Sequence, residues 1–144
     1  MIQVKDVVKS FDGNVVLNHV SANFEDGKVN MIIGQSGSGK TVLMKSMIGL
    51  HQIDGGEIVF DTRAGQQNLA GMTEKEVRML HREVGMLFQG AALFDSMTVQ
   101  ENVMYPLEMF SDMTDEEKVA RARFCLERVN MPERAFGLMP SEIS

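Results

Sequence analysis

The sequence predicts an α/β fold with a β-rich N-terminal part and a helical C-terminal part. Three observations carry this prediction: β-prone runs between turn signals in the first third, a glycine-rich loop that opens a helix near residue 40, and helix-start signals after residue 95. The 144 residues suffice for about one domain with its own core. Apolar residues make up 44% and charged residues 24%, as in ordinary soluble globular proteins.

The charge and the cysteine count exclude several classes of function. A net charge of −6 argues against nucleic acid as the main partner, because no excess of Lys and Arg is present to neutralise phosphates. The single cysteine, Cys125, excludes an internal disulfide and gives no metal spacing. No apolar run approaches the ~18–20 residues of a membrane span, and the N-terminus lacks a signal-peptide pattern. We therefore expect a cytoplasmic chain.

The first third of the chain reads as strands and turns. Residues 2–11 form a β-prone run, residues 12–14 (Asp-Gly-Asn) a turn signal, and residues 15–24 a second run that alternates imperfectly. After a further turn at residues 25–28, the short apolar run at residues 29–33 is bounded by a glycine. That pattern predicts a buried strand.

The middle of the chain predicts a helix, a strand and a loop. Residues 41–50 carry Leu, Met, Val and Ile on nearly every face, which indicates a buried helix. The Asp-Gly-Gly of residues 54–56 breaks it, and residues 57–60 are expected to form another strand. Residues 61–72 are polar and contain glycine, so they are interpreted as a surface loop.

Three helix starts follow, with one more short strand between the first helix and the second. Thr73 opens a helix with a Thr–Glu capping box that runs to about Arg82, and residues 84–88 predict a second short buried strand. Thr98 and Thr114 each begin a further helix. The last helix has apolar positions on one face, and Pro132 marks its end.

Residues 34–41 (Gly-Gln-Ser-Gly-Ser-Gly-Lys-Thr) match the phosphate-binding loop G-x-x-x-x-G-K-[ST], and they lie between a predicted strand and a helix. Glycines let successive backbone N–H groups turn inward around a phosphate, and the helix dipole points at the same anion. Lys40 is expected to reach the β- and γ-phosphates and the Thr41 hydroxyl to bind Mg²⁺. Ser36 and Ser38 add polar contacts. The sequence therefore predicts binding of a nucleoside triphosphate, with ATP and Mg²⁺ as the expected ligands.

The segments around the loop resemble the ATP-binding cassette (ABC) family of transporter ATPases over nearly the whole chain. The loop has that family's G-x-S-G-x-G-K-[ST] form. The other matching segments are residues 11–14 (Phe-Asp-Gly-Asn), 54–58 (Asp-Gly-Gly-Glu-Ile), 84–89 (Val-Gly-Met-Leu-Phe-Gln), 93–94 (Leu-Phe) and 98–103 (Thr-Val-Gln-Glu-Asn-Val). Within the family, residues 86–97 and 105–107 are most similar to the Mla-type phospholipid-transport ATPases.

The resemblance implies a P-loop NTPase fold of the ABC type and a set of site residues. Phe11 stands where the family carries an adenine-stacking aromatic, usually tyrosine. Gln89 stands in the Q-loop position, where it would position water and Mg²⁺ and report the γ-phosphate to the helical part. Nucleotide binding would fall to Phe11 and the loop residues, and metal binding to Thr41 and Gln89. The nucleotide-binding loop residues are Gly34, Ser36, Gly37, Ser38, Gly39, Lys40 and Thr41.

The resemblance also implies partners, a location and an organisation. ABC ATP-binding subunits work with membrane-spanning permease subunits and with a second ATPase subunit in a head-to-tail dimer. Such a chain lies at the inner face of the cell membrane through its partners. Residues 1–94 would form the β-rich P-loop core and residues 95–144 the first portion of the helical subdomain.

The last residues, 140–144 (Pro-Ser-Glu-Ile-Ser), resemble the start of the family signature L-S-G-G-Q. We expect this chain to be the N-terminal portion of a longer ATPase, because the signature glycines, the Walker B aspartate and the catalytic glutamate have no counterpart in it. Two alternatives remain open: a non-hydrolytic nucleotide-binding module, or another P-loop enzyme such as a small-molecule kinase. A GTPase is less well supported, since no N-K-x-D motif is present.

Overall fold

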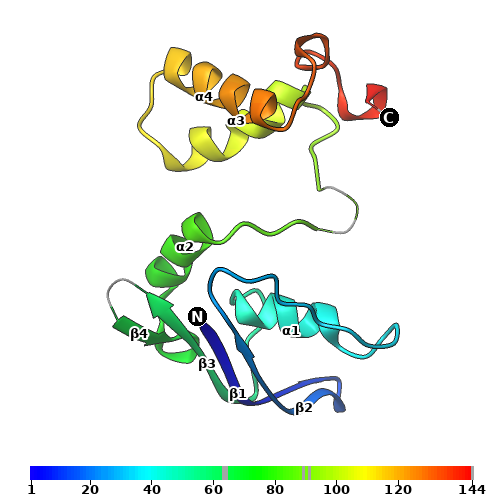
Figure 1. Cartoon of the computed structure of the whole chain (residues 1–144), viewed down its shortest axis with the longest axis vertical. Coiled ribbons are helices and arrows are strands. Elements are labelled where there is room, and N and C mark those ends of the chain that lie inside the picture. The colour runs from blue at the N-terminus through cyan, green and yellow to red at the C-terminus, as the bar shows by residue number, and fades with distance from the viewer. Residues whose placement is uncertain (63–64, 89, 91, 144) are drawn as a thin grey trace. The chain divides into compact units, whose positions relative to one another are not determined.

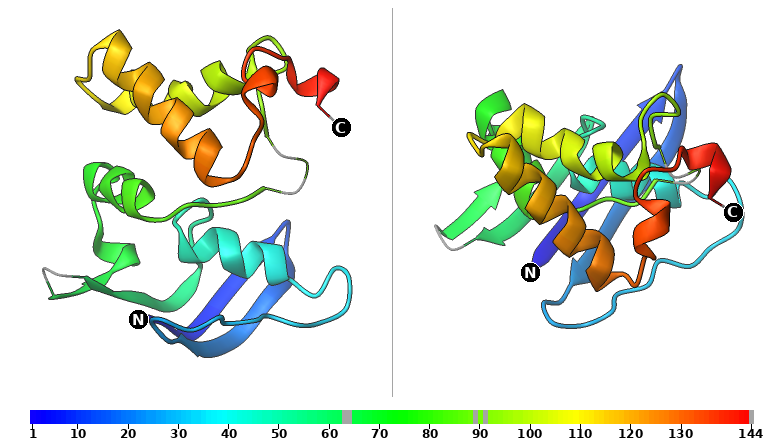
Figure 2. Two further views of the ribbon diagram at one scale, coloured as in Figure 1. Left: turned by 45° about the horizontal axis from the view of Figure 1, so that its top comes forward. Right: turned by 90° about the horizontal axis from the view of Figure 1, so that it is seen from above.

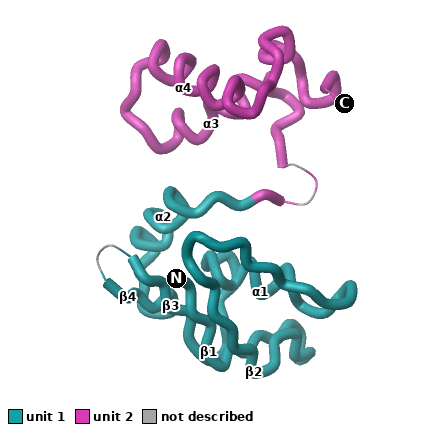
Figure 3. Tube along the Cα trace, viewed as in Figure 1, with its two compact units in different colours: residues 1–86 teal, residues 87–144 magenta. Residues whose placement is uncertain are grey.

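The computed structural model describes residues 1–62, 65–88, 90 and 92–143. The chain consists of two compact units, residues 1–86 and residues 87–144 (Figure 3). The first unit contains the sheet with two α-helices, and the second contains two further α-helices with short 3₁₀ turns (Figure 1). The sequence prediction of β-rich and helical parts is thereby confirmed.

The sheet of the first unit is antiparallel throughout its described pairs, with strand order β2-β1-β3-β4. The four strands are β1 (Ile2–Phe11), β2 (Asn14–Phe24), β3 (Gly55–Thr62) and β4 (Gly65–Asn68). Strands β1 and β2 form a hairpin in which Phe11 pairs with Asn14. Asp12 and Gly13 both have positive φ, 48° and 79°, as a two-residue hairpin turn requires. The predicted strands and the turn between them are confirmed, and the structure adds their pairing as a hairpin.

Helices α1 (Lys40–Met47) and α2 (Glu74–Glu83) lie on the same side of this sheet (Figure 2). They contribute Leu43, Met47 and Leu80 to a core that also contains side chains from three strands. The strand residues of this core are Val4, Val7, Leu17, Ile58 and Phe60. Burial of these apolar side chains is the main term that holds the unit together.

Two predicted strands are wrong. Residues 29–33 form no strand, and the side chains of Val29, Met31 and Ile33 are almost fully exposed, whereas Ile32 packs against the core. Residues 84–88 also lack strand structure, and Leu87 is exposed. Both segments have the apolar composition of a buried strand. Among the described residues, however, neither pairs with another strand, and a strand forms only where its backbone groups find a partner.

Two further expectations need correction. The stretch at residues 61–72 is not one loop, because β3 continues to Thr62, β4 pairs with it and a 3₁₀ turn follows at Leu69–Gly71. The helix expected at residues 41–50 is shorter, ending at Met47. It buries one face rather than all faces, since Met44 is half exposed.

The second unit is a helical pair closed by the chain that follows it. Helix α3 (Val99–Phe110) and helix α4 (Asp115–Arg128) are followed by 3₁₀ turns at Glu133–Ala135 and Pro140–Glu142. Val99, Leu126 and Phe136 form its core. The carbonyls of Leu138 and Phe136 accept hydrogen bonds from the Val99 and Gln100 N–H groups at the start of α3, which are 2.9 and 3.0 Å away. The predicted helix starts at residues 98 and 114 are confirmed.

No helix among the described residues is long and apolar enough to cross a membrane.

Candidate functional site

The glycine-rich loop at residues 34–41 is an exposed turn that leads directly into α1. Its residues 34–38 are exposed, Gly39 is buried and Lys40 is half-buried as the first residue of the helix. Gly37 and Gly39 have φ of 80° and 89°, in the region that other residues rarely adopt. The Ser38 N–H closes the turn by donating to the Gln35 carbonyl oxygen at 3.2 Å. Such a glycine-rich path lets other backbone N–H groups turn toward a ligand.

Space is tight at two of the glycines, and at Gly39 the neighbouring atoms include backbone that cannot rotate away. A Cβ at Gly34 would lie 2.7 Å from the Ser38 Oγ. At Gly39 a Cβ would lie 3.0 Å from the Val16 carbonyl oxygen and 3.1 Å from a Leu17 methyl carbon, because the loop packs directly on β2. Contact with β2 thus fixes the position of the loop relative to the β1–β2 hairpin.

The Lys40 side chain folds back over the loop. Its Nζ donates hydrogen bonds to the carbonyl oxygens of Gly34 at 2.8 Å and Gln35 at 2.6 Å. A lysine ammonium has three N–H donors, so these two bonds leave one for a ligand. The ammonium is therefore held at the loop as a fixed positive charge, which is the arrangement an anion needs.

The N-terminus of α1 differs from those of the other three α-helices described. Helices α2, α3 and α4 each begin after a threonine whose hydroxyl and a glutamate three residues later form a capping box. Helix α1 begins after Gly39, which provides no side-chain cap, and its first turn has no acidic residue. Its first N–H groups and the positive end of its dipole are left for an external anion.

The residues at this loop fit a nucleotide triphosphate with Mg²⁺. Thr41 is exposed in the first turn of α1, next to Lys40. Among the described residues, no cluster of three or more His, Cys, Asp or Glu side chains gathers to hold a metal ion. Mg²⁺ is commonly bound through few protein ligands together with substrate phosphates, so a hydroxyl beside a phosphate cradle suits it.

Phe11 lies at the end of β1, on the hairpin against which the loop packs. Phe11 is 38% exposed. The His51 imidazole meets it nearly edge-on, with ring centroids 5.4 Å apart and an interplanar angle of 76°. The Lys9 Nζ lies 5.2 Å from the ring centroid. The ring is thus a half-exposed apolar surface with two defined neighbours.

The structure adds a contact between β1 and the segment after α1. The Asp54 carboxylate accepts hydrogen bonds from the Lys9 Nζ at 2.9 Å and from the Ser10 N–H at 2.6 Å. The hydrogen bond from Lys9, followed by that from Ser10, lowers the pKa of Asp54. Sequence reasoning identified residues 54–58 as a helix breaker, a strand and a segment that resembles the family, but it assigned no role to Asp54 or to His51. No local signal joins residues so far apart in the chain.

Gln89, the other predicted site residue, lies outside the described residues.

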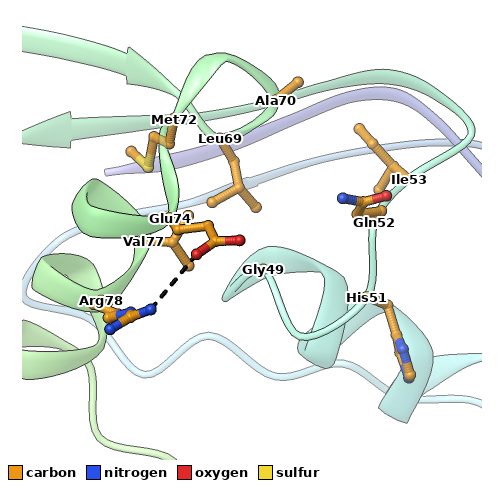
Figure 4. Close-up of a pocket in the computed structure, with 10 residues that line it drawn as sticks. All are labelled: Gly49, His51, Gln52, Ile53, Leu69, Ala70, Met72, Glu74, Val77 and Arg78. Carbon is orange, nitrogen blue, oxygen red and sulfur yellow. Dashed lines mark ion pairs between the residues drawn. The ribbon is translucent and has the colours of Figure 1, made fainter.

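A separate pocket of about 630 Å³ is present in the first unit (Figure 4). It lies at the C-terminal end of α1, opposite to the end that carries the loop, and an ion pair of 3.5 Å joins Glu74 and Arg78 at its wall. None of residues 34–41 lines it. The pocket is lined by Gly49, His51, Gln52, Ile53, Leu69, Ala70, Met72, Glu74, Val77 and Arg78. The loop is therefore a surface cradle and not part of this pocket.

Comparison with known proteins identifies relatives of the whole chain. The sequence profile of the family described as ABC transporter matches residues 17–144. The chain is 33% identical over 135 residues to the methionine import ATP-binding protein MetN of Rhizobium johnstonii, covering 94% of this chain and 36% of that protein. It is 35% identical over 144 residues to the glutamine transport ATP-binding protein GlnQ of Escherichia coli K12, covering 100% of this chain and 58% of that protein.

A solved structure shows the same fold. The dimeric ATP-binding cassette MJ0796, in a post-hydrolysis state bound to ADP and Pi, matches with a TM-score of 0.86 at 28% identity. The match covers 100% of this chain and 63% of that one. The chain thus spans between about a third and three fifths of the length of these relatives. The two curated relatives are named for methionine and glutamine, so the expected specific likeness to phospholipid-transport ATPases is not shown.

Proposed function

The chain belongs to the ABC transporter family, and we propose that it provides the phosphate-binding half of the ATP site in an ATP-binding subunit. The observation that carries this proposal is the geometry of the loop. Lys40 is held over the loop by the Gly34 and Gln35 carbonyls, directly beside the one α-helix N-terminus in the described chain that has no capping side chain. A fixed cation next to open N–H donors matches a phosphate chain.

Each loop residue has a role in this proposal. The backbone N–H groups of the loop and of the first turn of α1 surround the β-phosphate, and Ser36 and Ser38 add polar contacts. Lys40 donates its remaining N–H to the β- and γ-phosphates. The Thr41 hydroxyl is a ligand for Mg²⁺, which would neutralise phosphate charge when bound. Phe11 provides a surface on which the adenine ring stacks.

The partners follow from family membership and are part of the proposal. We infer that the chain works with membrane-spanning permease subunits and pairs head-to-tail with a second ATPase subunit; the dimeric state of the MJ0796 cassette supports the pairing. Gln89 would sense the γ-phosphate and report it to the helical portion, residues 95–144, while residues 1–94 would form the P-loop core. Such a chain would lie in the cytoplasm against the membrane.

The transported substrate is the least constrained part of the proposal. The resemblance expected from residues 86–97 and 105–107 to phospholipid-transport ATPases favours a lipid. The relatives named for methionine and glutamine support import of a small polar solute instead. We propose coupling of ATP binding to transport, with phospholipid as the first substrate to test in the complete transporter.

The loop assignment is tested by calorimetric titration of the chain with ATP in the presence of Mg²⁺. We expect Lys40→Ala to weaken ATP binding by about 10- to 100-fold, because one charge-assisted contact is lost. Lys75→Ala, which removes an exposed lysine from α2, is the matched control and should bind as the wild type does. Equal ATP affinities for Lys40→Ala and Lys75→Ala would contradict the proposed function.

Phosphate release measured in the same samples separates the remaining alternatives. Binding without release fits a non-hydrolytic module or a portion of an ATPase that lacks its catalytic groups. Release that depends on an added acceptor would indicate a small-molecule kinase.

A further inference from the structure

Lys9 connects Phe11 to the segment between α1 and β3. Its Nζ lies 5.2 Å from the Phe11 ring centroid and 2.9 Å from the Asp54 Oδ1. Only 14% of the Lys9 side chain is exposed. A lysine at a surface usually samples many rotamers, but this one is fixed at its end by a carboxylate and along its length by burial. The ammonium is therefore held at one place beside the ring.

Asp54 also fixes the backbone that carries Phe11. Its second carboxylate oxygen accepts the Ser10 N–H at 2.6 Å, and its own N–H donates to the Val8 carbonyl at 2.8 Å. Asp54 thus holds the backbone of residues 8 and 10 and the side chain of residue 9, which are the three residues directly before Phe11. The hydrogen bond from Lys9, followed by that from the Ser10 N–H, lowers the Asp54 pKa, so the carboxylate is ionised at neutral pH.

His51 provides the second contact of the Phe11 ring. It meets the ring nearly perpendicularly, with centroids 5.4 Å apart, and belongs to the segment between α1 and Asp54. Lys9 and His51 together orient the ring, yet more than a third of Phe11 remains exposed. An oriented aromatic with a free surface loses little rotamer entropy when a flat ring stacks on it.

From this arrangement we propose that Lys9 and Asp54 are positioning residues that hold Phe11 in place for the nucleobase. The proposal rests on the proposed ATP site and deepens it. Asp54 acts through Lys9 and through the β1 backbone, and neither residue needs to touch the phosphates. Loss of either Lys9 or Asp54 should therefore weaken binding of the base and leave binding of the phosphate chain unchanged.

Two ligands separate these effects, namely ATP and inorganic tripolyphosphate, which has the phosphates without the base. Both are titrated calorimetrically with Mg²⁺ into the full chain and into Lys9→Met, Lys9→Arg and Asp54→Asn. We expect Lys9→Met and Asp54→Asn to weaken ATP binding by about 3- to 10-fold while tripolyphosphate binding stays within about twofold. Lys9→Arg should retain ATP affinity, because a guanidinium preserves both the carboxylate bond and the contact with the ring.

Control variants exclude a general effect on the hairpin. Lys5→Met removes an exposed lysine from the same strand and should leave both affinities unchanged. Phe11→Ala should reduce ATP affinity at least as much as Lys9→Met, and Lys9→Met added to Phe11→Ala should have no further effect, since the two residues act together. This double-mutant result is one that a merely structural role of Lys9 would not give.

The contrary results are distinct. Parallel losses of ATP and tripolyphosphate affinity in Lys9→Met would overturn the positioning role, because the hairpin would then be supporting the loop as a whole. Unchanged ATP affinity in both Lys9→Met and Asp54→Asn would overturn it as well, while leaving the proposed ATP site intact. If the wild-type chain binds neither ligand, the proposed function itself fails.

Discussion

At the scale of single residues, Gly56 illustrates how closely the strands of the first unit approach one another. Its φ is 84°, and a Cβ there would lie 2.4 Å from the Asp6 carbonyl oxygen and 2.5 Å from that of Lys5. Asp6 has a positive φ of 53° at an irregularity of β1, where its carboxylate lies 2.9 Å from the His19 Nδ1. The glycine directly follows the Asp54–Gly55 segment that anchors β1.

Replacing Gly56 with alanine should therefore be strongly destabilising. The added methyl group meets two backbone oxygens that cannot rotate away, and alanine disfavours the positive φ. We expect a loss of about 3 kcal/mol in the free energy of unfolding. Urea denaturation followed by circular dichroism measures it. Gly71→Ala is the matched control, because a Cβ there meets no atom within 4 Å. Similar stabilities of the two variants would show that the strands can move apart.

At the scale of elements, the helices are specified by local signals. Thr73, Thr98 and Thr114 each cap a helix, and in each the glutamate three residues later completes the box. In two boxes the hydrogen bonds from the threonine N–H, and then from its hydroxyl, lower the pKa of the glutamate; these glutamates are Glu76 and Glu101. Such bonds form within four residues, so the sequence is sufficient to predict them.

The lowered pKa values predict the direction of an acid effect on stability. A carboxylate whose pKa is lower in the folded state stabilises the fold above its unfolded pKa, and that stabilisation is lost as the pH falls through the folded pKa. We expect the urea midpoint of the wild type to fall as the pH is lowered from neutral through the unfolded pKa and then the folded pKa of these glutamates. Glu76→Gln with Glu101→Gln keeps hydrogen-bond acceptors but does not titrate.

The double glutamine variant should therefore show a shallower dependence of the urea midpoint on pH than the wild type. Asp54 contributes in the same direction in both proteins, so a residual slope is expected. Identical slopes for the wild type and the variant would mean that the capping glutamates do not contribute to the acid effect.

At the scale of the whole molecule, the exposed apolar segment at residues 29–33 stands out. Val29, Met31 and Ile33 are 95%, 79% and 82% exposed, whereas Ile32 between them packs on the core. Alternation of this kind belongs to a strand with one face covered. Exposed, strand-like apolar segments are sites of edge-to-edge association between chains.

We therefore expect this 144-residue chain to self-associate as its concentration rises. Met31→Ser combined with Ile33→Ser should shift the weight-average sedimentation coefficient toward the monomer value, because the apolar row is interrupted. Val129→Ser is the control, since it removes a single exposed apolar side chain from the other unit. Association that is equally strong in the double serine variant and in Val129→Ser would place the contact elsewhere.

Elements that depend on neighbouring residues were predicted correctly from the sequence. Elements that depend on pairing between segments far apart in the chain were not. The β1–β2 hairpin and the capped helices were predicted because their turn and cap residues are adjacent in the chain. Strand β4, Gly65–Asn68, was missed because it is polar and exists only by pairing with β3. Residues 29–33 and 84–88 were predicted as strands from composition alone, but pairing decides whether a strand forms.

The candidate site also consists of a part set by neighbouring residues and a part set by contacts between distant ones. The sequence by itself determined the loop: glycines at its turns, then Lys40 and Thr41 at the start of a helix, a local pattern whose chemistry follows from its spacing. Only the tertiary structure decided what surrounds Phe11. Lys9 and Asp54 are 45 residues apart, and they meet because β1 pairs with β3, with Val8 opposite Gly55. Such contacts depend on the register of paired strands, which no short stretch of sequence encodes.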